Sequence, residues 1–315
     1  MSAHSPVAAT LAFNPALDDL IADYLQALRA EGRSPRTISW YGMFLREFCH
    51  FASRADRPPR LHDLSAPVAR RWLVALRSRP TPPAPASLAG RVRSLRAFAS
   101  WVQAEFDLDR HPLQGLKTPR VPRTLIHSLR DSEVRALLTA AGQGPFGERD
   151  TAVLLVLLDS GMRLGELTGL QVGRVDFENG QCRVMGKGAK ERRVPLGRSA
   201  RRALRRTLLA RGRLAPDAAL FVADRGGPLT GSGLQKIVRR AAQRAGLEVR
   251  CSPHVLRHTF ARSFLANGGD VFSLQRILGH SPASLDVTRR YVELLDDDLR
   301  EVHRRASPMD LLRRG

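Results

Sequence analysis

The chain has 315 residues, which is enough for two ordinary domains. Its 51 basic and 30 acidic residues leave a formal net charge of +21, a surplus that points to a polyanionic partner. Double-stranded DNA fits best, because Lys and Arg side chains that neutralise phosphates release counterions and so drive binding. Hydrophobic residues make up 43% of the chain, which predicts packed cores and excludes wholesale disorder.

Several other classes of protein are excluded by composition. The cysteines Cys49, Cys182 and Cys251 form no C-x-x-C pair, so neither a disulfide framework nor a metal site is expected. The amino-terminal twenty residues lack the basic start and apolar run of a signal peptide. The most apolar stretch, residues 152–158, is too short to cross a bilayer. We therefore expect a cytoplasmic protein with no membrane partner.

After a flexible arm over residues 1–14, the first domain is predicted to be a small helical bundle over residues 15–106. Apolar residues at three- and four-residue spacing predict helices over 17–28, 35–52, 66–78 and 86–105. Ser34-Pro35 supplies an N-cap and a first-turn proline for the second helix. The proline-rich run 80–85 separates the last two helices as a stiff loop.

Residues 107–124 are predicted to link the two domains. Their prolines prevent a continuing helix, and their charges argue against burial. The basic side chains Lys117, Arg120 and Arg123 lead us to expect that this linker lies on DNA. An ordinary solvated loop is the alternative interpretation.

The second domain, residues 125–315, is predicted to be mostly helical. The expected helices cover residues 128–141 (or 131–141), 150–159, 164–170, 199–212, 231–245, 253–267, 271–278 and 296–305. Two strands, 182–185 and 192–196, flank a hairpin turn over 186–190 whose glycines permit positive φ. The expected fold class is therefore mainly α with a small antiparallel β-sheet.

Two short motifs offer cations for phosphoryl transfer, which needs positive charge against the non-bridging oxygens. Arg163 and Glu166 form an R-x-x-E pair just after the glycine that ends a helix. His254 and Arg257 lie one turn apart on a helix that begins at Ser252-Pro253, where the helix dipole favours an anion. A planar guanidinium group can donate hydrogen bonds to two phosphate oxygens at once, and it stays protonated.

Each of these motifs is weak by itself. Arg130 and Glu133 repeat the R-x-x-E pattern, and His127 and Arg130 repeat the H-x-x-R pattern, with no apparent chemistry attached. For Arg163 alone, a surface arginine capping a helix is the simpler interpretation.

Lys187 and Tyr291 complete the candidate chemistry. Lys187 is predicted at the tip of the hairpin, where it can donate a proton to a leaving alkoxide, and Lys190 competes for that role. Tyr291 is the only tyrosine in the second half of the chain and follows Arg289-Arg290, which favour its phenolate. Considered singly, a solvated turn lysine and a core tyrosine are the alternative interpretations.

In combination these residues resemble the tyrosine recombinase family, also called phage-type integrases. The resembling blocks, in the order of the family, are LLDSGMRLGELTGL (157–170), VMGKGAKERRVPL (184–196), SPHVLRHTFARSFLANG (252–268) and LQRILGHSPASLDVTRRYVEL (274–294). The amino-terminal bundle resembles the core-binding domain of Xer-like members. Several weak motifs in one order are jointly specific, so the resemblance implies a core-binding DNA-binding domain followed by a tyrosine-recombinase catalytic domain.

The resemblance also implies catalytic roles. The implied catalytic residues are Arg163, Lys187, His254, Arg257, His280 and Tyr291, with Glu166 in support. Tyr291 would form a 3′-phosphotyrosyl link to DNA, the arginines and His254 would stabilise the phosphorane, and Lys187 would protonate the leaving 5′-oxygen. His280 would help to place Tyr291. The ester stores the bond energy, so no cofactor is implied, and a tetramer on two synapsed sites would carry out strand exchange.

One departure from the family pattern lies before the tyrosine. Tyr291 stands eleven positions after His280, two more than the family commonly has. The extra residues, near Ser281-Pro282-Ala283, either lengthen a loop harmlessly or change when and in which subunit Tyr291 acts. Two other functions stay open, an idle DNA-binding regulator and a type IB-like topoisomerase. The DNA sequence of the target site and the need for a partner recombinase also stay open.

Overall fold

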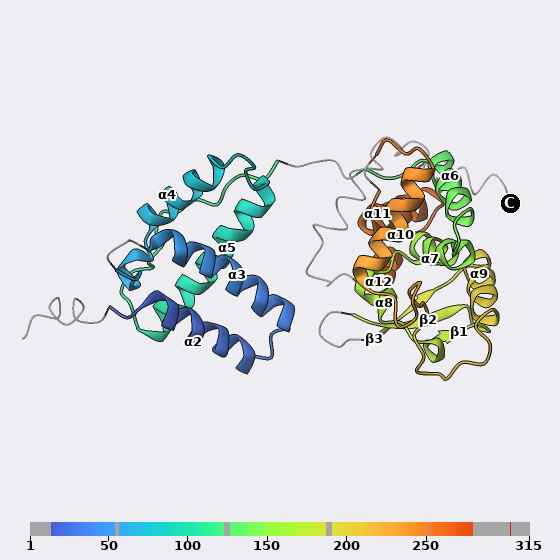
Figure 1. Ribbon diagram of the computed structural model, residues 1–315, viewed down its shortest axis with the longest axis horizontal. Coiled ribbons are helices and arrows are strands. Elements are labelled where there is room, and N and C mark those ends of the chain that lie inside the picture. Colours follow the sequence, from blue (N-terminus) through green and yellow to red (C-terminus); the bar gives the residue numbers. More distant parts are fainter. Residues whose placement is uncertain are drawn as a thin grey trace, which may run out of the picture. The chain divides into compact units, whose positions relative to one another are not determined.

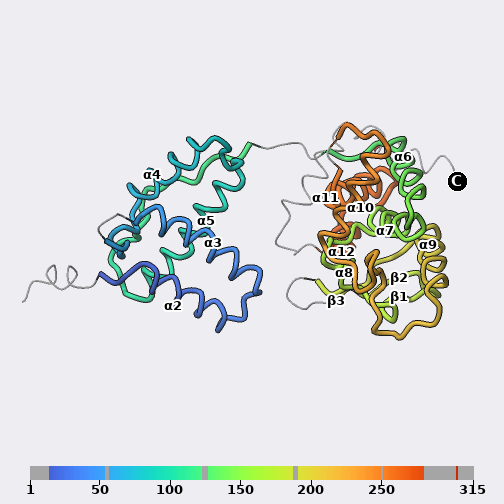
Figure 2. Tube along the Cα trace, in the orientation of Figure 1, coloured from blue at the N-terminus to red at the C-terminus, as the bar shows by residue number. Residues whose placement is uncertain are grey.

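The computed structural model describes residues 14–53, 57–122, 127–186, 191–249, 251–279 and 303 (Figures 1 and 2). The chain divides into two compact units, residues 1–124 and 125–315, each with its own hydrophobic core. The predicted extents of the arm, bundle, linker and catalytic domain stay predictions. Among the described helices, none is both long and apolar enough to cross a membrane.

The first unit contains the four predicted helices. They are α2 (Leu17–Ala30), α3 (Pro35–Ala52), α4 (Ala66–Arg77) and α5 (Pro85–Glu105), with a 3-10 turn at Leu61–Asp63 that was not predicted. Ser34 caps α3 as expected, since its hydroxyl oxygen accepts a hydrogen bond from the Thr37 amide at 3.2 Å. The ring of Tyr24 lies 5.5–5.8 Å from those of Tyr41, Phe98 and Trp101, and this aromatic cluster ties α2, α3 and α5 together.

Part of the predicted linker packs into the first core. Leu113 and Leu116 are each 2% exposed and belong to that core, and Arg96 of α5 donates a hydrogen bond to the Leu116 carbonyl. The expectation that charge keeps this stretch from burial is therefore wrong for these two leucines. Burying their apolar side chains is favourable even though their neighbours in the sequence are polar. Lys117 and Arg120 are exposed, whereas Arg123 lies outside the described residues.

The second unit has one buried helix at its centre. Its helices are α6 (Asp131–Gly142), α7 (Gly147–Ser160), α8 (Leu164–Thr168), α9 (Arg198–Leu209), α10 (Gly231–Arg244), α11 (Pro253–Ala266) and α12 (Val271–Leu278). Helix α7 begins three residues before its predicted start and contacts α6, α9, α10 and α11. Residues on several sides of α7 are buried because neighbours surround it, which explains its uninterrupted apolar sequence.

A three-stranded antiparallel sheet of order β1-β2-β3 packs on this helical core. Strands β1 (Val175–Asp176), β2 (Gln181–Met185) and β3 (Glu191–Pro195) are consecutive, and β1 was missed because two residues carry no periodicity. The mainly helical fold with a small antiparallel sheet is thus confirmed. The hairpin tip 187–190 and the helix predicted over 296–305 lie outside the described residues, apart from His303.

Two glycines end helices in the left-handed conformation and prepare the site. Gly161 follows α7 with φ 58°, and Gly279 follows α12 with φ 62°. A Cβ atom on Gly161 would lie 2.4 Å from the ring of Phe260, so both the backbone angle and the packing require glycine there. The chain turns sharply at each of these glycines. As a result, the ends of α7 and α12 lie near α11 and β3.

Candidate active site

Arg163 stands at the start of α8 in a closed pair with Glu166. The Arg163 backbone amide donates to Glu166 Oε2 at 2.8 Å, and Arg163 Nη1 donates to Glu166 Oε1 at 2.9 Å. This local arrangement caps the helix, as the simpler interpretation of the motif expects. The second guanidinium nitrogen, Nη2, donates to the Gly279 carbonyl at 3.0 Å, so Arg163 also contacts the far end of α12.

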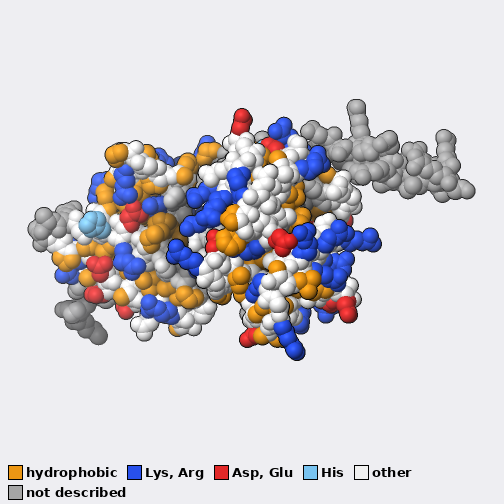
Figure 3. Space-filling model, turned by 45° about the vertical axis from the view of Figure 1, so that its right-hand side comes forward, with side chains coloured by type: hydrophobic (Ala, Val, Ile, Leu, Met, Phe, Trp, Pro, Cys, Tyr) orange, Lys and Arg blue, Asp and Glu red, His pale blue; other side chains and the backbone are white. Residues whose placement is uncertain are grey.

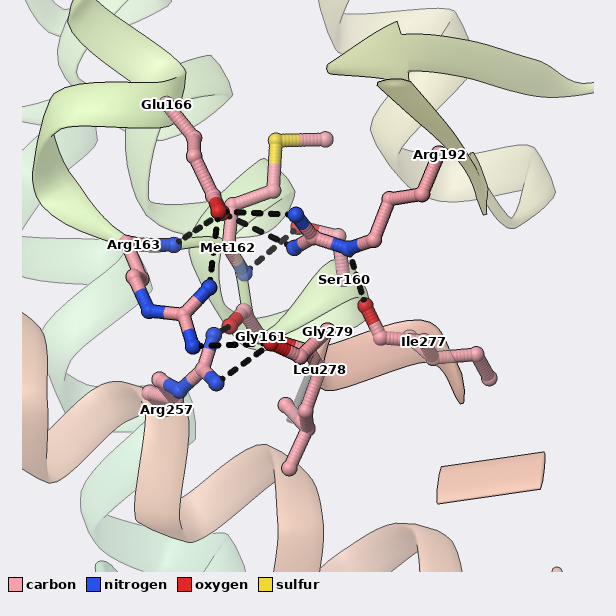
Figure 4. Close-up of polar contacts among 10 residues, drawn as sticks. All are labelled: Ser160, Gly161, Met162, Arg163, Glu166, Arg192, Arg257, Ile277, Leu278 and Gly279. Atoms are coloured by element: carbon pink, nitrogen blue, oxygen red, sulfur yellow. Dashed lines mark hydrogen bonds and ion pairs between the residues drawn. The ribbon is translucent and has the colours of Figure 1, made fainter. Parts of the chain in front are cut away.

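Arg192 of β3 approaches Glu166 from the opposite side (Figure 4). Its two Nη atoms donate to the two carboxylate oxygens of Glu166 at 2.7 and 2.9 Å, a bidentate pair. Its Nε donates to the Ile277 carbonyl at 2.9 Å. The glutamate is therefore held between two arginines that come from different elements.

Arg257 is buried on α11 beside this pair, with 6% of its surface exposed. Its Nη1 donates to the Gly161 carbonyl at 2.5 Å, and its Nη2 donates to the Leu278 carbonyl at 2.8 Å. These contacts join the end of α7 to the end of α12 through one guanidinium group. They bring Arg257 close to Arg163, as Figure 4 shows.

Three consecutive carbonyls at the end of α12 thus each accept a hydrogen bond from a different arginine. Ile277 accepts from Arg192, Leu278 from Arg257 and Gly279 from Arg163. The carbonyl end of a helix carries partial negative charge, so it attracts guanidinium groups. Residue 280 follows directly, so the arginines hold the chain just before the segment on which His280 and Tyr291 lie.

The charges at this place favour an anion. Three guanidinium groups and one carboxylate leave a surplus of positive charge, because arginine stays protonated at any ordinary pH. Burial works against ionisation of Glu166, but hydrogen bonds from Arg192 and Arg163 outweigh it and hold its pKa below the usual range. Arg163 keeps 41% of its side chain exposed, so it is the most accessible of these three arginines.

His254 and His258 form a pair one turn apart on α11. Their Nε2 atoms are 2.9 Å apart and their rings are nearly perpendicular, so one nitrogen donates and the other accepts. Burial, and then the charge of Arg257, lower the pKa of His254. His254 is therefore favoured in its neutral form at neutral pH. Ser252 caps this helix through the Val255 amide, as the Ser-Pro start predicted.

The described structure brings Arg163, Glu166 and Arg257 together from the start of α8 and from α11, and His254 lies one turn before Arg257 on α11. Lys187, Lys190, His280 and Tyr291 lie outside the described residues, so their roles stay predictions. Sequence reasoning missed Arg192 as a member of this group. One pattern could have revealed it: Arg192, Val194 and Leu196 alternate on one face of the predicted strand, which puts a charge on its apolar side.

Comparisons with known proteins agree along most of the chain. The phage integrase family profile matches residues 127–297, and the profile of the phage integrase N-terminal SAM-like domain matches residues 21–105. The tyrosine recombinase XerC of Escherichia coli O157:H7 (strain EC4115) is 34% identical over 287 residues, 90% of this chain and 95% of that relative. XerC of Salmonella typhi is 37% identical over 235 residues, 74% of this chain and 78% of that relative.

Solved structures show the same architecture. The crystal structure of XerA recombinase aligns with a TM-score of 0.51 at 27% identity, covering 92% of this chain and 99% of that one. The integrase of transposon Tn1549, solved with a circular intermediate DNA, shares the fold with a TM-score of 0.70 at 18% identity, covering 88% and 94%. The chain therefore belongs to the phage integrase family and is a tyrosine-type site-specific recombinase.

Proposed function

We propose that this recombinase cleaves and rejoins duplex DNA through a covalent 3′-phosphotyrosyl link formed by Tyr291. One observation carries the proposal: Arg163 and Arg257, distant in sequence, donate hydrogen bonds to the Gly279 and Leu278 carbonyls, and these two residues come just before His280 in the sequence. Two guanidinium groups this close present a place for a phosphate whose charge grows in the transition state. The XerC relatives, which carry the name tyrosine recombinase, support the same chemistry.

In the proposed reaction, the phenolate oxygen of Tyr291 attacks the scissile phosphorus in line with the 5′-oxygen. The bond from phosphorus to that 5′-oxygen breaks, and Lys187 donates the proton that the departing oxygen needs. Arg163, Arg257 and neutral His254 donate hydrogen bonds to the non-bridging oxygens, while His280 helps to place Tyr291. A 5′-hydroxyl from a partner strand then attacks the phosphorus, gives its proton back to Lys187 and displaces Tyr291 as the phenolate, so no metal or energy-rich cofactor is required.

The proposed substrate is double-stranded DNA bound by both units. Lys and Arg side chains are spread over the face of the molecule in Figure 3, with few acidic ones between them. We assign phosphate contacts to Lys117, Arg120, Arg123 and Lys190. The first two of these are exposed. The XerH recombinase, which shares this fold, was solved bound to its difH substrate.

Strand exchange is proposed to occur in the cytoplasm, in a tetramer on two synapsed sites, with identical subunits or with a partner recombinase. The tail after Tyr291 would dock into a neighbouring subunit. Deleting residues 296–315 should then abolish assembly on DNA and recombination while leaving binding to a single half-site. Intact recombination by the truncated protein would contradict the docking.

The covalent step is tested by trapping on nicked suicide duplexes that carry candidate or random sites. Wild type should give a DNA-linked band on a denaturing gel without added metal, and Tyr291→Phe should give none while still binding the same DNA. Sequencing the linked DNA would identify the site. No band from wild type on DNA that it binds would favour an idle DNA-binding regulator.

A second assay separates recombination from topoisomerase activity. Supercoiled plasmids with one or two copies of the recovered site should yield recombinant products from wild type. Relaxation without recombinants would instead favour a type IB-like topoisomerase.

A further inference from the structure

Arg192 is a charged residue on the inward face of an otherwise ordinary edge strand. In β3 burial alternates, so Arg192 shares its face with the buried Val194, whereas Arg193 points outward and is exposed. Only 14% of the Arg192 side chain is exposed. Burying a guanidinium is costly unless it is paired and hydrogen-bonded, so its contacts identify what the fold gains from it.

These contacts use three of the five N–H groups of Arg192. Two go to the carboxylate of Glu166, at 2.7 and 2.9 Å, and one goes from Nε to the Ile277 carbonyl at 2.9 Å. Glu166 in turn accepts both the backbone amide and Nη1 of Arg163. Arg192 therefore connects the partner of Arg163 with the end of α12, and it does so from a third element.

We infer that Arg192 is a positioning residue of the active site, which orients Arg163 through Glu166 and fixes the end of α12 relative to it. This inference rests on the proposed phosphate-binding role of Arg163. Arg163 contacts both oxygens of Glu166, through its backbone amide and through Nη1, but both contacts come from the same end of α8. The bidentate pair with Arg192 fixes the plane of the carboxylate, and the carboxylate then fixes the guanidinium of Arg163.

The backbone at Gly279 is shaped to admit Arg192. A Cβ atom at Gly279 would lie 2.8 Å from Arg192 Nε and 2.9 Å from its Cζ. Glycine at this position therefore serves two needs, the left-handed φ of 62° and the close approach of the guanidinium. The segment leading to His280 and Tyr291 starts at this contact.

The test compares Arg192→Gln with a matched control, Arg193→Gln. Both remove one positive charge from the same strand, but among the described residues Arg193 has no hydrogen bond or ion pair, so its loss leaves the site intact. The full-length variants are assayed for binding and for the rate of covalent capture at the DNA site recovered with wild type. A thermal melt of each variant confirms that it folds.

We expect Arg192→Gln to bind DNA within about threefold of wild type and to be captured up to about a hundredfold more slowly, as misplaced catalytic groups typically are. Arg193→Gln should be captured at the wild-type rate. Arg192→Lys keeps the charge but lacks the planar fork, so it should recover only part of the rate. Should Arg192→Gln not fold, the lysine variant carries the comparison.

A second substrate distinguishes positioning of Arg163 from general weakening of the site. Replacing one non-bridging oxygen of the scissile phosphate by a methyl group removes its negative charge, so a guanidinium contributes less to the transition state. The rate deficits of Arg163→Ala and of Arg192→Gln should both shrink on this methylphosphonate. The inference would be overturned if the rate deficit of Arg163→Ala shrank on the methylphosphonate while that of Arg192→Gln stayed equally large on both substrates.

The remaining outcomes separate this inference from the proposed function. Capture by Arg192→Gln at the wild-type rate overturns the positioning role while leaving the function intact. No capture by wild type, or a deficit of Arg163→Ala that does not shrink on the uncharged substrate, contradicts the proposed role of Arg163 itself, and the inference falls with it.

Discussion

Within the residues that the structure describes, the R-x-x-E pattern occurs at Arg130 and again at Arg163, and these two copies have nearly the same local geometry. The backbone amide of Arg130 donates to Glu133 at 2.7 Å and its side chain at 3.2 Å, and the corresponding distances from Arg163 to Glu166 are 2.8 and 2.9 Å. Both pairs cap the start of a helix. Sequence and local structure alone therefore cannot separate them.

The two copies differ in what lies around them. The Arg130 side chain is 75% exposed, and its only described ion-pair partner is Glu133. Glu166, by contrast, is buried between Arg163 and Arg192, and Arg163 reaches the Gly279 carbonyl. The comparison shows that the same short motif can contribute to a candidate active site only where other helices and strands pack around it.

The largest difference between the copies is expected in catalysis. Arg163→Ala should slow covalent capture by at least about a thousandfold, since an arginine that stabilises a transferring phosphoryl group contributes on that scale. Arg130→Ala should leave the rate unchanged. Rates of adduct formation on suicide DNA, followed on denaturing gels, measure both. Equal rates for the two variants would remove Arg163 from the proposed mechanism.

The next largest effect concerns the glycine turn that closes the site. Gly161→Ala combines a left-handed backbone with a clash against Phe260, and should cost about 2–5 kcal/mol of stability. Gly246→Ala, after α10, has a similar φ of 63° but nothing within 4 Å of the new methyl group, and should cost about 1–2 kcal/mol. Thermal melts compare them, and equal shifts would show that packing at Gly161 is unimportant.

A smaller difference is expected between the two glutamates. Glu166→Gln removes the charge from buried hydrogen bonds to two arginines and should cost about 2 kcal/mol. For a domain of this size that is a shift of roughly 4–8 °C in the melting midpoint. Glu133→Gln should produce a much smaller shift, because its pair with Arg130 is exposed to solvent and screened by salt.

The smallest effect is a dependence on pH. The folded-state pKa of Glu166 lies below its ordinary value of 4.5, so the ionised group stabilises the fold above that pH, and the stabilisation is lost as the pH falls through the folded-state pKa. The stability difference between wild type and Glu166→Gln should stay constant from pH 7 to about 5 and then narrow. Denaturant unfolding at stepped pH measures it, and a difference that persists unchanged to pH 3 would contradict the assignment.

Raising the salt concentration should separate the effects of the two glutamate substitutions on stability. The pKa of Glu133 is also lowered, through hydrogen bonds from Arg130, so Glu133→Gln should show a weak dependence of the same sign. In 1 M salt the Debye length falls to about 3 Å, and the Glu133 effect should vanish while that of Glu166 persists. Loss of both effects in salt would indicate that Glu166 is effectively solvated.

Much of the fold was predictable because it depends on local pattern. Helical periodicity located α2 to α5 and α10 to α12 within about two residues, and the Ser34 and Ser252 caps were correct. The wrong predictions of structure arose where the local sequence pattern carries no information about it. Strand β1 is two residues long, and the buried Leu113 and Leu116 lie among prolines and charges that suggested a solvated linker.

What the sequence by itself determined is the inventory of the site: its motifs, their order and the candidate nucleophile. Local chemistry also set the helix caps at Ser34 and Ser252, since these depend on neighbouring residues alone, whereas Gly161 and Gly279 answer both to a local left-handed turn and to tertiary contacts with Phe260 and Arg192. Only the tertiary structure decided which R-x-x-E pair is enclosed, and that Arg192 joins Glu166 to the end of α12. Such contacts join residues far apart in the chain, and their strength comes from burial, which no short stretch of sequence encodes.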